Sequence, residues 1–246
     1  MKRFLTFILL GVLTISWARA DMGGFTLKSV NINAVVHENS TWDVTETLEV
    51  DFSEPRHGVY KYIPSRFFYG YTKPDGTVKE NVYKNRIKNV QVDGYDYATD
   101  NDDTAAENKI IRIGSADYCV EGLQIYTIRY TVQYMDDRID SEDFLCHTIW
   151  GDGWNTVAEQ MNFTIKFDKP LPAAAVKNLN LYSGSRGSTV NADSVELHYD
   201  ATTHSIVGSL QNLPANHAIT ISTKLPQGFW KAESKNLLLF YFIAVR

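Results

Sequence analysis

The chain has 246 residues, of which 44% are hydrophobic and 22% are charged, and its formal net charge at pH 7 is −5. This composition is that of a folded globular protein with enough residues for one sizeable core. The negative charge and the lack of a long basic run argue against nucleic acid as a partner, because phosphate binding needs clustered Lys and Arg.

Residues 1–20 have the features of a secretory signal peptide. Lys2 and Arg3 precede the apolar run 4–17, which is followed by the small-x-small pattern Ala18-Arg19-Ala20. The run is short for a membrane span. We therefore expect cleavage after residue 20 and export of the remainder, with an uncleaved anchor as the alternative.

The clearest strand pattern runs from Thr41 to Phe52. Its even positions are apolar, apart from one carboxylate, and its odd positions are polar, which predicts a half-buried strand. The exception is Glu46, which lies on the inward face and needs a partner there. The nearest cations that follow in the sequence are Arg56, Lys61 and Arg66.

Further strands are indicated by alternation and by β-branched and aromatic residues. We predict them at Phe25–Val36, Ile87–Val92, Lys109–Ile113, Gln124–Tyr134, Phe144–Trp150, Val157–Phe167, Asn178–Tyr182, Val195–Tyr199, Ser205–Leu210 and Ala218–Lys224. No long amphipathic helix is evident. Many short strands separated by turn residues predict an all-β, antiparallel β-sandwich, immunoglobulin-like or elaborated, over residues 21–229. It forms one domain or two intimately joined sheet pairs.

The stretch 54–67 combines basic, aromatic, Gly and Pro residues directly after the clearest strand. It is either a ligand-binding loop or a turn and edge strand that closes one end of the sandwich. Gly58 permits backbone angles denied to other residues, and Pro64 ends ladder pairing, which favours the architectural interpretation.

Two histidines and two cysteines are the candidate reactive groups. Cys146 and His147 are adjacent, so on a strand they point to opposite faces and cannot act together. His57 and His147 are the candidate bases, and Cys119 could still meet a distant histidine. In an exported protein Cys119 and Cys146 either form a disulfide or remain buried thiols, because sequence spacing does not report geometry. No G-x-S-x-G or H-E-x-x-H pattern occurs. We expect no catalytic residue, metal site or cofactor.

Trp150 and Trp154 flank a Gly-Asp-Gly turn. Paired aromatics at a loop can stack on sugars or face a membrane, and they can equally seal the core where a hairpin turns. The core interpretation is favoured.

The chain ends in the apolar run Leu237–Val245. A membrane-spanning helix needs about 20 apolar residues, so this run cannot span a bilayer by itself. We interpret residues 230–246 either as the start of a truncated transmembrane segment or as a short element packed on the domain.

A series of short motifs follows in a characteristic order. They are Val44-Thr45-Glu46 with Phe52, Gly58-Val59-Tyr60-Lys61-Tyr62-Ile63-Pro64, Ile111-Arg112-Ile113-Gly114, Tyr126-Thr127-Ile128-Arg129-Tyr130, Trp150-Gly151-Asp152-Gly153-Trp154 and Leu225-Pro226-Gln227-Gly228-Phe229. From about residue 25 to 229 the series resembles the predicted membrane protein family known as domain of unknown function 2207. The resemblance implies a signal peptide, an extracytoplasmic β-rich domain and then transmembrane helices. The family has no established chemistry, so it supplies no catalytic residue.

The resemblance also suggests which cation neutralises Glu46. It puts a Glu and a basic residue at positions 46 and 61, although Lys61 stands where the family usually has Arg. The signature loop, which includes Gly58, Tyr60, Lys61, Ile63 and Pro64, would then be a latch. In this latch Tyr60 and Ile63 pack, Lys61 pairs with Glu46, and Pro64 releases the chain.

Three functions are compatible with these observations. The leading hypothesis is an exported, envelope-associated, non-catalytic module that binds a partner or ligand on the outer side of the cytoplasmic membrane. Its attachment to the membrane would come through a segment missing from this chain. The alternatives are a hydrolase acting on envelope polymers and a carbohydrate-binding module. A pocket with converging His, Asp and Cys side chains would favour the hydrolase, and an exposed aromatic strip would favour sugar binding.

Overall fold

The computed structural model of the protein describes residues 24–72, 75–101, 108–134, 142–185 and 188–231. The expected signal peptide and nearly all of the C-terminal stub lie outside these ranges. The described residues form β1 (Phe25–Val36), β2 (Thr41–Arg56), β3 (Val59–Pro64), β4 (Arg66–Thr72), β5 (Val78–Val92), β6 (Tyr97–Asn101), β7 (Asn108–Ile113), β8 (Val120–Tyr134), β9 (Glu142–Trp150), β10 (Ala158–Phe167), α1 (Ala173–Lys177), β11 (Asn180–Gly184), β12 (Glu196–Asp200), β13 (Ser205–Leu213) and β14 (Ala218–Pro226). The all-β class is confirmed.

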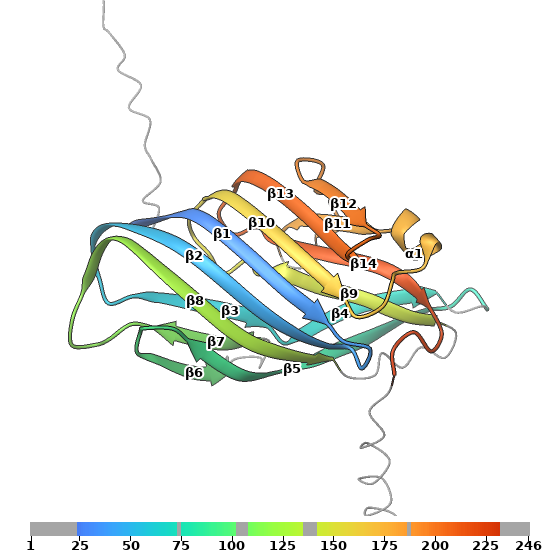
Figure 1. Ribbon diagram of the computed structural model, residues 1–246. Coiled ribbons are helices and arrows are strands. Elements are labelled where there is room, and N and C mark those ends of the chain that lie inside the picture. The colour runs from blue at the N-terminus through green and yellow to red at the C-terminus, as the bar shows by residue number, and fades with distance from the viewer. Residues whose placement is uncertain (1–23, 73–74, 102–107, 135–141, 186–187, 232–246) are drawn as a thin grey trace, which may run out of the picture.

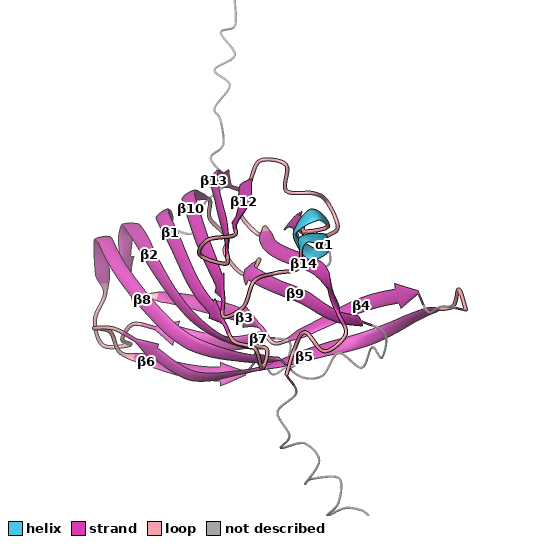
Figure 2. Ribbon diagram, turned by 45° about the vertical axis from the view of Figure 1, so that its right-hand side comes forward, coloured by secondary structure: helices cyan, strands magenta, loops and turns pink. Residues whose placement is uncertain are grey.

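The described strands are arranged in two layers. One layer is an eight-stranded sheet in the order β12-β13-β10-β1-β2-β8-β5-β4. The other layer consists of two three-stranded sheets, β11-β14-β9 and β3-β7-β6, which cover one face of the large sheet (Figures 1 and 2). The sandwich therefore has one continuous layer and one divided layer.

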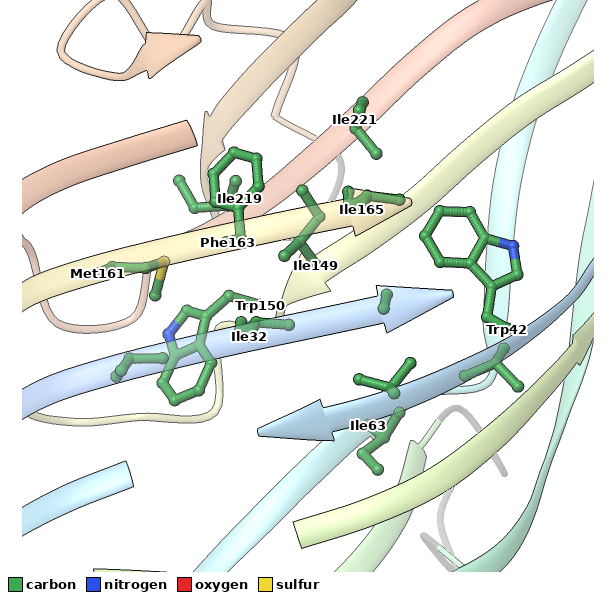
Figure 3. Packing of buried hydrophobic residues seen from close by; sticks show 14 of the residues in the cluster. Ile32, Trp42, Ile63, Ile149, Trp150, Met161, Phe163, Ile165, Ile219 and Ile221 are labelled. Carbon is green, nitrogen blue, oxygen red and sulfur yellow. The ribbon is translucent and has the colours of Figure 1, made fainter. Parts of the chain in front are cut away.

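The alternating pattern of β2 decides which face of the large sheet is covered. Its inward apolar residues, Trp42, Val44, Leu48, Val50 and Phe52, are all buried. They pack with inward residues of the small sheets, and Figure 3 shows Ile149 and Trp150 of β9 and Ile63 of β3 facing the large sheet. The polar residues at the alternate positions form the outer face.

One strand pair departs from the expected antiparallel arrangement. β1 pairs with β2 in antiparallel fashion, with Asn31 opposite Thr47, but with β10 in parallel, with Asn31 opposite Asn162. Half-buried strands show the same alternation in both arrangements, so sequence periodicity carries no signal of direction. The large sheet is thus mixed.

Three elements were not predicted from the sequence, namely β4, β6 and α1. β6 has the sequence Tyr-Ala-Thr-Asp-Asn, in which Asp and Asn are disfavoured in strands. It is a strand because β7 supplies a ladder partner, with Tyr97 opposite Ile113. α1 is a single short turn of helix, and none of the described residues belongs to a helix long and apolar enough to cross a membrane.

Candidate functional site

The inward carboxylate of β2 meets a lysine from the opposite layer. Glu46 is fully buried and Lys61, on β3, is 2% exposed. Lys61 Nζ lies 2.8 Å from Glu46 Oε2. Of the three cations considered from the sequence, Lys61 is therefore the partner, while Arg56 pairs with Glu54 at the surface. The ion pair ties the large sheet to the small sheet β3-β7-β6.

Two aromatic residues complete the surroundings of the ion pair. The Tyr130 hydroxyl on β8 donates a hydrogen bond of 2.5 Å to Glu46 Oε1. Lys61 Nζ also lies 4.0 Å from the ring centroid of Trp150 at the end of β9, a cation–π contact. Because β9 belongs to the other small sheet, all three sheets meet around one ammonium group.

Burial shifts the titration of these groups. Desolvation lowers the pKa of Lys61, and the Glu46 carboxylate opposes this shift. Desolvation, together with the Glu46 charge, raises the pKa of Tyr130 well above its ordinary value. Tyr130 is therefore a permanent hydrogen-bond donor to the carboxylate at physiological pH.

His147 extends the buried cluster along β9. Its ring lies 4.1 Å from that of Trp42, and it hydrogen-bonds the Tyr134 hydroxyl. Burial, and secondly the charge of Lys61, lower the pKa of His147 to about 3. Of the two candidate bases, His147 is thus a neutral core residue that solvent does not reach.

The second candidate base, His57, lies beside Cys119 at the surface. The Cys119 sulfur is 3.8 Å from both ring nitrogens, and His57 Nδ1 faces the carbonyl oxygens of Ser115 and Tyr118 at 3.0 and 3.2 Å. The distant histidine left open by the sequence is therefore His57. The sulfur lies beyond ordinary hydrogen-bond distance from both nitrogens, and solvent reaches the contact. This pair therefore lacks the enclosed geometry of a nucleophile and its base.

The two cysteines are not joined. Cys119 is an exposed free thiol, which differs from the buried thiols expected from the sequence, and Cys146 on β9 is a partly buried free thiol. Burial raises the pKa of Cys146 to about 11. The structure thus shows neither the disulfide nor two buried thiols.

The difference in environment predicts a difference in reactivity. Under native conditions at pH 8, iodoacetamide should modify Cys119 about tenfold or more faster than Cys146, since the thiolate is the reacting species and Cys146 is shielded. Mass spectrometry of tryptic peptides at timed intervals measures both rates in one sample. Equal rates, or a cross-linked Cys119–Cys146 peptide, would contradict the structure.

The aromatic loop is part of the core. Trp150 and Trp154 are 1% and 4% exposed, and their rings stack at 5.2 Å with an interplanar angle of 9°. The glycines between them allow close contact with β3, because a Cβ on Gly153 would lie 2.7 Å from the Tyr62 side chain. The loop seals the seam between the two small sheets, and it presents no aromatic surface to a ligand.

The signature loop forms most of the expected latch, with one correction. Val59, Lys61 and Ile63 alternate inward on β3 and are buried, and the strand ends at Pro64. Tyr60 was expected to pack in the core, but it is 52% exposed. Since side chains alternate across a strand, Tyr60 cannot share a face with Lys61.

Gly58 begins this latch at a close crossing of two backbones. Its φ is +130°, and a Cβ there would lie 1.9 Å from the carbonyl oxygen of Ile113. Gly114 shows the reciprocal contact, with φ of +123° and the carbonyl oxygen of His57 at 1.9 Å. Glycine is required at this crossing for two reasons: a side chain would collide with the other backbone, and the positive φ disfavours any residue with a Cβ.

Gly58→Ala should therefore lower the free energy of unfolding by about 2–4 kcal/mol, measured by urea denaturation. The matched control is Gly94→Ala, which has φ of +74° and nothing within 4 Å of the added Cβ. Only backbone strain acts in the control, so its loss should be about 1–2 kcal/mol. Equal losses in both variants would show that the close crossing is unimportant.

Comparison with models of protein families shows to which family the chain belongs. The model described as Predicted membrane protein (DUF2207) N-terminal domain matches residues 26–225. The chain belongs to this family. The resemblance drawn from the motifs is confirmed, and the match includes Glu46, Lys61, Tyr130 and His147. No curated protein matches the chain.

The chain has weak matches among solved structures. Native leukotriene A4 hydrolase from Saccharomyces cerevisiae gives a TM-score of 0.42 at 11% identity, over 83% of this chain and 30% of that chain. An M1 zinc metallopeptidase from Deinococcus radiodurans gives 0.38 at 8% identity, over 80% and 42%. The chain thus spans less than half the length of these proteins. At these scores the likeness says nothing about its activity.

A metal centre finds no support in the described ranges. Within them, no group of three or more His, Cys, Asp or Glu side chains could hold a metal ion. Among the described residues, the ionisable groups that the fold brings together include the buried pair Glu46–Lys61 and, at the surface, His57 with Cys119. His37 also lies at the surface between Asp43 and Asp168, at 3.0 and 2.9 Å. The buried ion pair has a structural effect, because it joins the large sheet to a small one.

Proposed function

We propose that the chain is the non-catalytic binding module of an envelope membrane protein, held on the outer side of the cytoplasmic membrane, where it binds a partner or ligand. One observation carries this proposal. The residue types that usually perform chemistry, namely Glu46, Lys61 and His147, are enclosed between the sheets. There Glu46 pairs with Lys61, and His147 hydrogen-bonds the Tyr134 hydroxyl. The family, whose described domain is the N-terminal part of a predicted membrane protein, supports the location.

The hydrolase alternative receives less support. It calls for converging His, Asp and Cys side chains in a pocket, but His57 and Cys119 meet on an exposed surface. His147 would have to act as a base from a site that solvent does not reach. A rigid sandwich with a polar outer face suits recognition better than turnover.

The location is tested with a reporter that is active only outside the cytoplasm. Alkaline phosphatase is fused after residue 231, once to residues 1–231 and once to the same segment without residues 2–20. Activity is expected only from the first fusion. Equal activity from both, or from neither, would contradict an exported module.

Binding without turnover is tested on isolated cell-envelope polymers. The purified chain should sediment with them saturably and release no soluble fragments, and a His57→Asn/Cys119→Ser variant should sediment equally well. Fragments released by the wild-type chain but not by this variant would establish the hydrolase instead. Failure of both proteins to sediment would overturn binding to these polymers.

A further inference from the structure

The outer face of the large sheet contains a hollow near its β12 edge. It has a volume of about 290 Å³ and lies over β10, β13 and the start of β12. The polar residues that line it are Gln160, Asn162, Ser194, Glu196, Ser209 and Gln211. Strand register explains the shape, because Ser209 lies between Asn162 and Glu196 in one cross-strand row. The smallest side chain of the row thus sits in its middle.

The lining groups are available for hydrogen bonding. Within the described ranges, the side chains of Gln160, Ser194, Glu196, Ser209 and Gln211 make no hydrogen bond or ion pair with the protein. Asn162 is the exception, since its Nδ2 donates to Asn31 Oδ1 at 3.1 Å. That bond fixes the amide and leaves Asn162 Oδ1 available as an acceptor. Several donors and acceptors therefore surround one small volume.

The charge of the hollow limits what it can bind. Among the described residues that line it, Glu196 is the single ionisable one, and none is Lys, Arg or His. A phosphate or carboxylate group would meet a carboxylate without a compensating cation, which disfavours anionic ligands. Carboxamide and hydroxyl side chains instead suit neutral ligands whose groups both donate and accept hydrogen bonds.

From the hollow, its unpaired polar groups and its charge, we propose that this outer-face hollow binds a neutral sugar residue of a saccharide chain. The volume lies just below the range of ordinary small-molecule pockets, which suits one or two rings. Gln160, Asn162 and Gln211 offer paired amide donors and acceptors to neighbouring hydroxyl or acetamido groups. The small side chain of Ser209 leaves space for the sugar ring. The inference rests on the proposed function and specifies the ligand class of the module.

The expected affinity is low. The described lining residues include no aromatic side chain, so they do not supply the stacking that strengthens many sugar sites. Hydrogen bonds exchanged with water have small net values, and a dissociation constant on the order of 1–10 mM follows. Tight envelope binding would then require several sugar residues on one polymer.

The test is an NMR titration of the ¹⁵N-labelled protein with the neutral disaccharide N,N′-diacetylchitobiose. The side-chain amide signals of Gln160, Asn162 and Gln211 should shift saturably. Ser209→Gln, which fills the hollow, should weaken binding about tenfold or more. Thr45→Gln, on the outer face of β2 and outside the hollow, should bind as the wild type does.

Three outcomes would overturn the site. They are no saturable shift up to about 50 mM disaccharide, equal binding by Ser209→Gln, and tighter binding of the anionic probe glucose 6-phosphate or of the peptide trialanine. Each removes the saccharide site but leaves the export and sedimentation results of the proposed function unaffected. The two failures are therefore distinguishable.

Discussion

Glu46→Ala is expected to lower the free energy of unfolding by about 3–5 kcal/mol. The substitution leaves the Lys61 ammonium group buried without its counter-ion and removes the acceptor of the Tyr130 hydroxyl. An unpaired charge buried between two sheets raises the free energy of the folded state far more than a buried ion pair does. Equilibrium denaturation in urea, monitored by tryptophan fluorescence and circular dichroism, measures the loss.

The same loss should be partly recovered when the cation is removed too. Lys61→Met in the Glu46→Ala background replaces the stranded ammonium with an apolar side chain of similar length, so the double variant should be more stable than Glu46→Ala alone. The control pair is Lys28 and Glu159, joined at 2.8 Å but 39% and 45% exposed. Solvent screens these charges, so their removal should change stability little. A double variant less stable than Glu46→Ala would reject the latch.

The second large effect is a loss of stability in acid that depends on His147. Its pKa is about 3 in the folded protein against 6.5 for the free side chain. Between these values the unfolded chain binds a proton that the folded chain does not, so stability falls as pH decreases from 6.5 towards 3. The loss is about 1.4 kcal/mol for each pH unit.

His147→Gln tests this assignment. The variant should be less stable than the wild type at pH 7, because it loses the ring contact with Trp42. Its stability should fall less steeply between pH 6.5 and 3, because Gln does not titrate. The difference between the two slopes, taken from denaturation midpoints at several pH values, isolates His147 from the carboxylates that both proteins share. Parallel slopes would show that His147 does not carry the effect.

Local patterns in the sequence predicted much of the fold. Phe25–Val36 was predicted with the bounds that β1 has, and the inward position of Glu46 followed from alternation along β2. The choice of Lys61 needed the family resemblance, because Arg56 and Arg66 also follow Glu46 in the sequence and distance along the chain does not distinguish the three cations. Alternation on β3 could have corrected Tyr60, since a strand that turns Lys61 inward must turn Tyr60 outward.

Contacts between layers could not be derived in this way. Tyr130 and Tyr134 share one face of the predicted strand Gln124–Tyr134 with Ile128 and Val132. Hydroxyl groups on a buried face indicate buried acceptors. Tyr130 reaches Glu46 on the neighbouring strand β2, and Tyr134 reaches His147 on β9 of the other layer. The sequence of β8 alone encodes neither partner. The meeting of His57 with Cys119, some 60 residues apart, has the same origin. The hollow also depends on the register of β10, β12 and β13, which no single strand encodes.

The position of β1 has a consequence for the order of folding. β1 ends at Val36 and lies inside the large sheet, yet its parallel neighbour β10 begins only at Ala158. A chain synthesised from its N-terminus therefore carries a β1–β2 hairpin with an open edge until residues near 167 have been made. Pairings over such separations form slowly, and open edges recruit other chains. We expect a nascent chain that stops before β10 to aggregate, so this domain has to be kept unfolded until late in its synthesis.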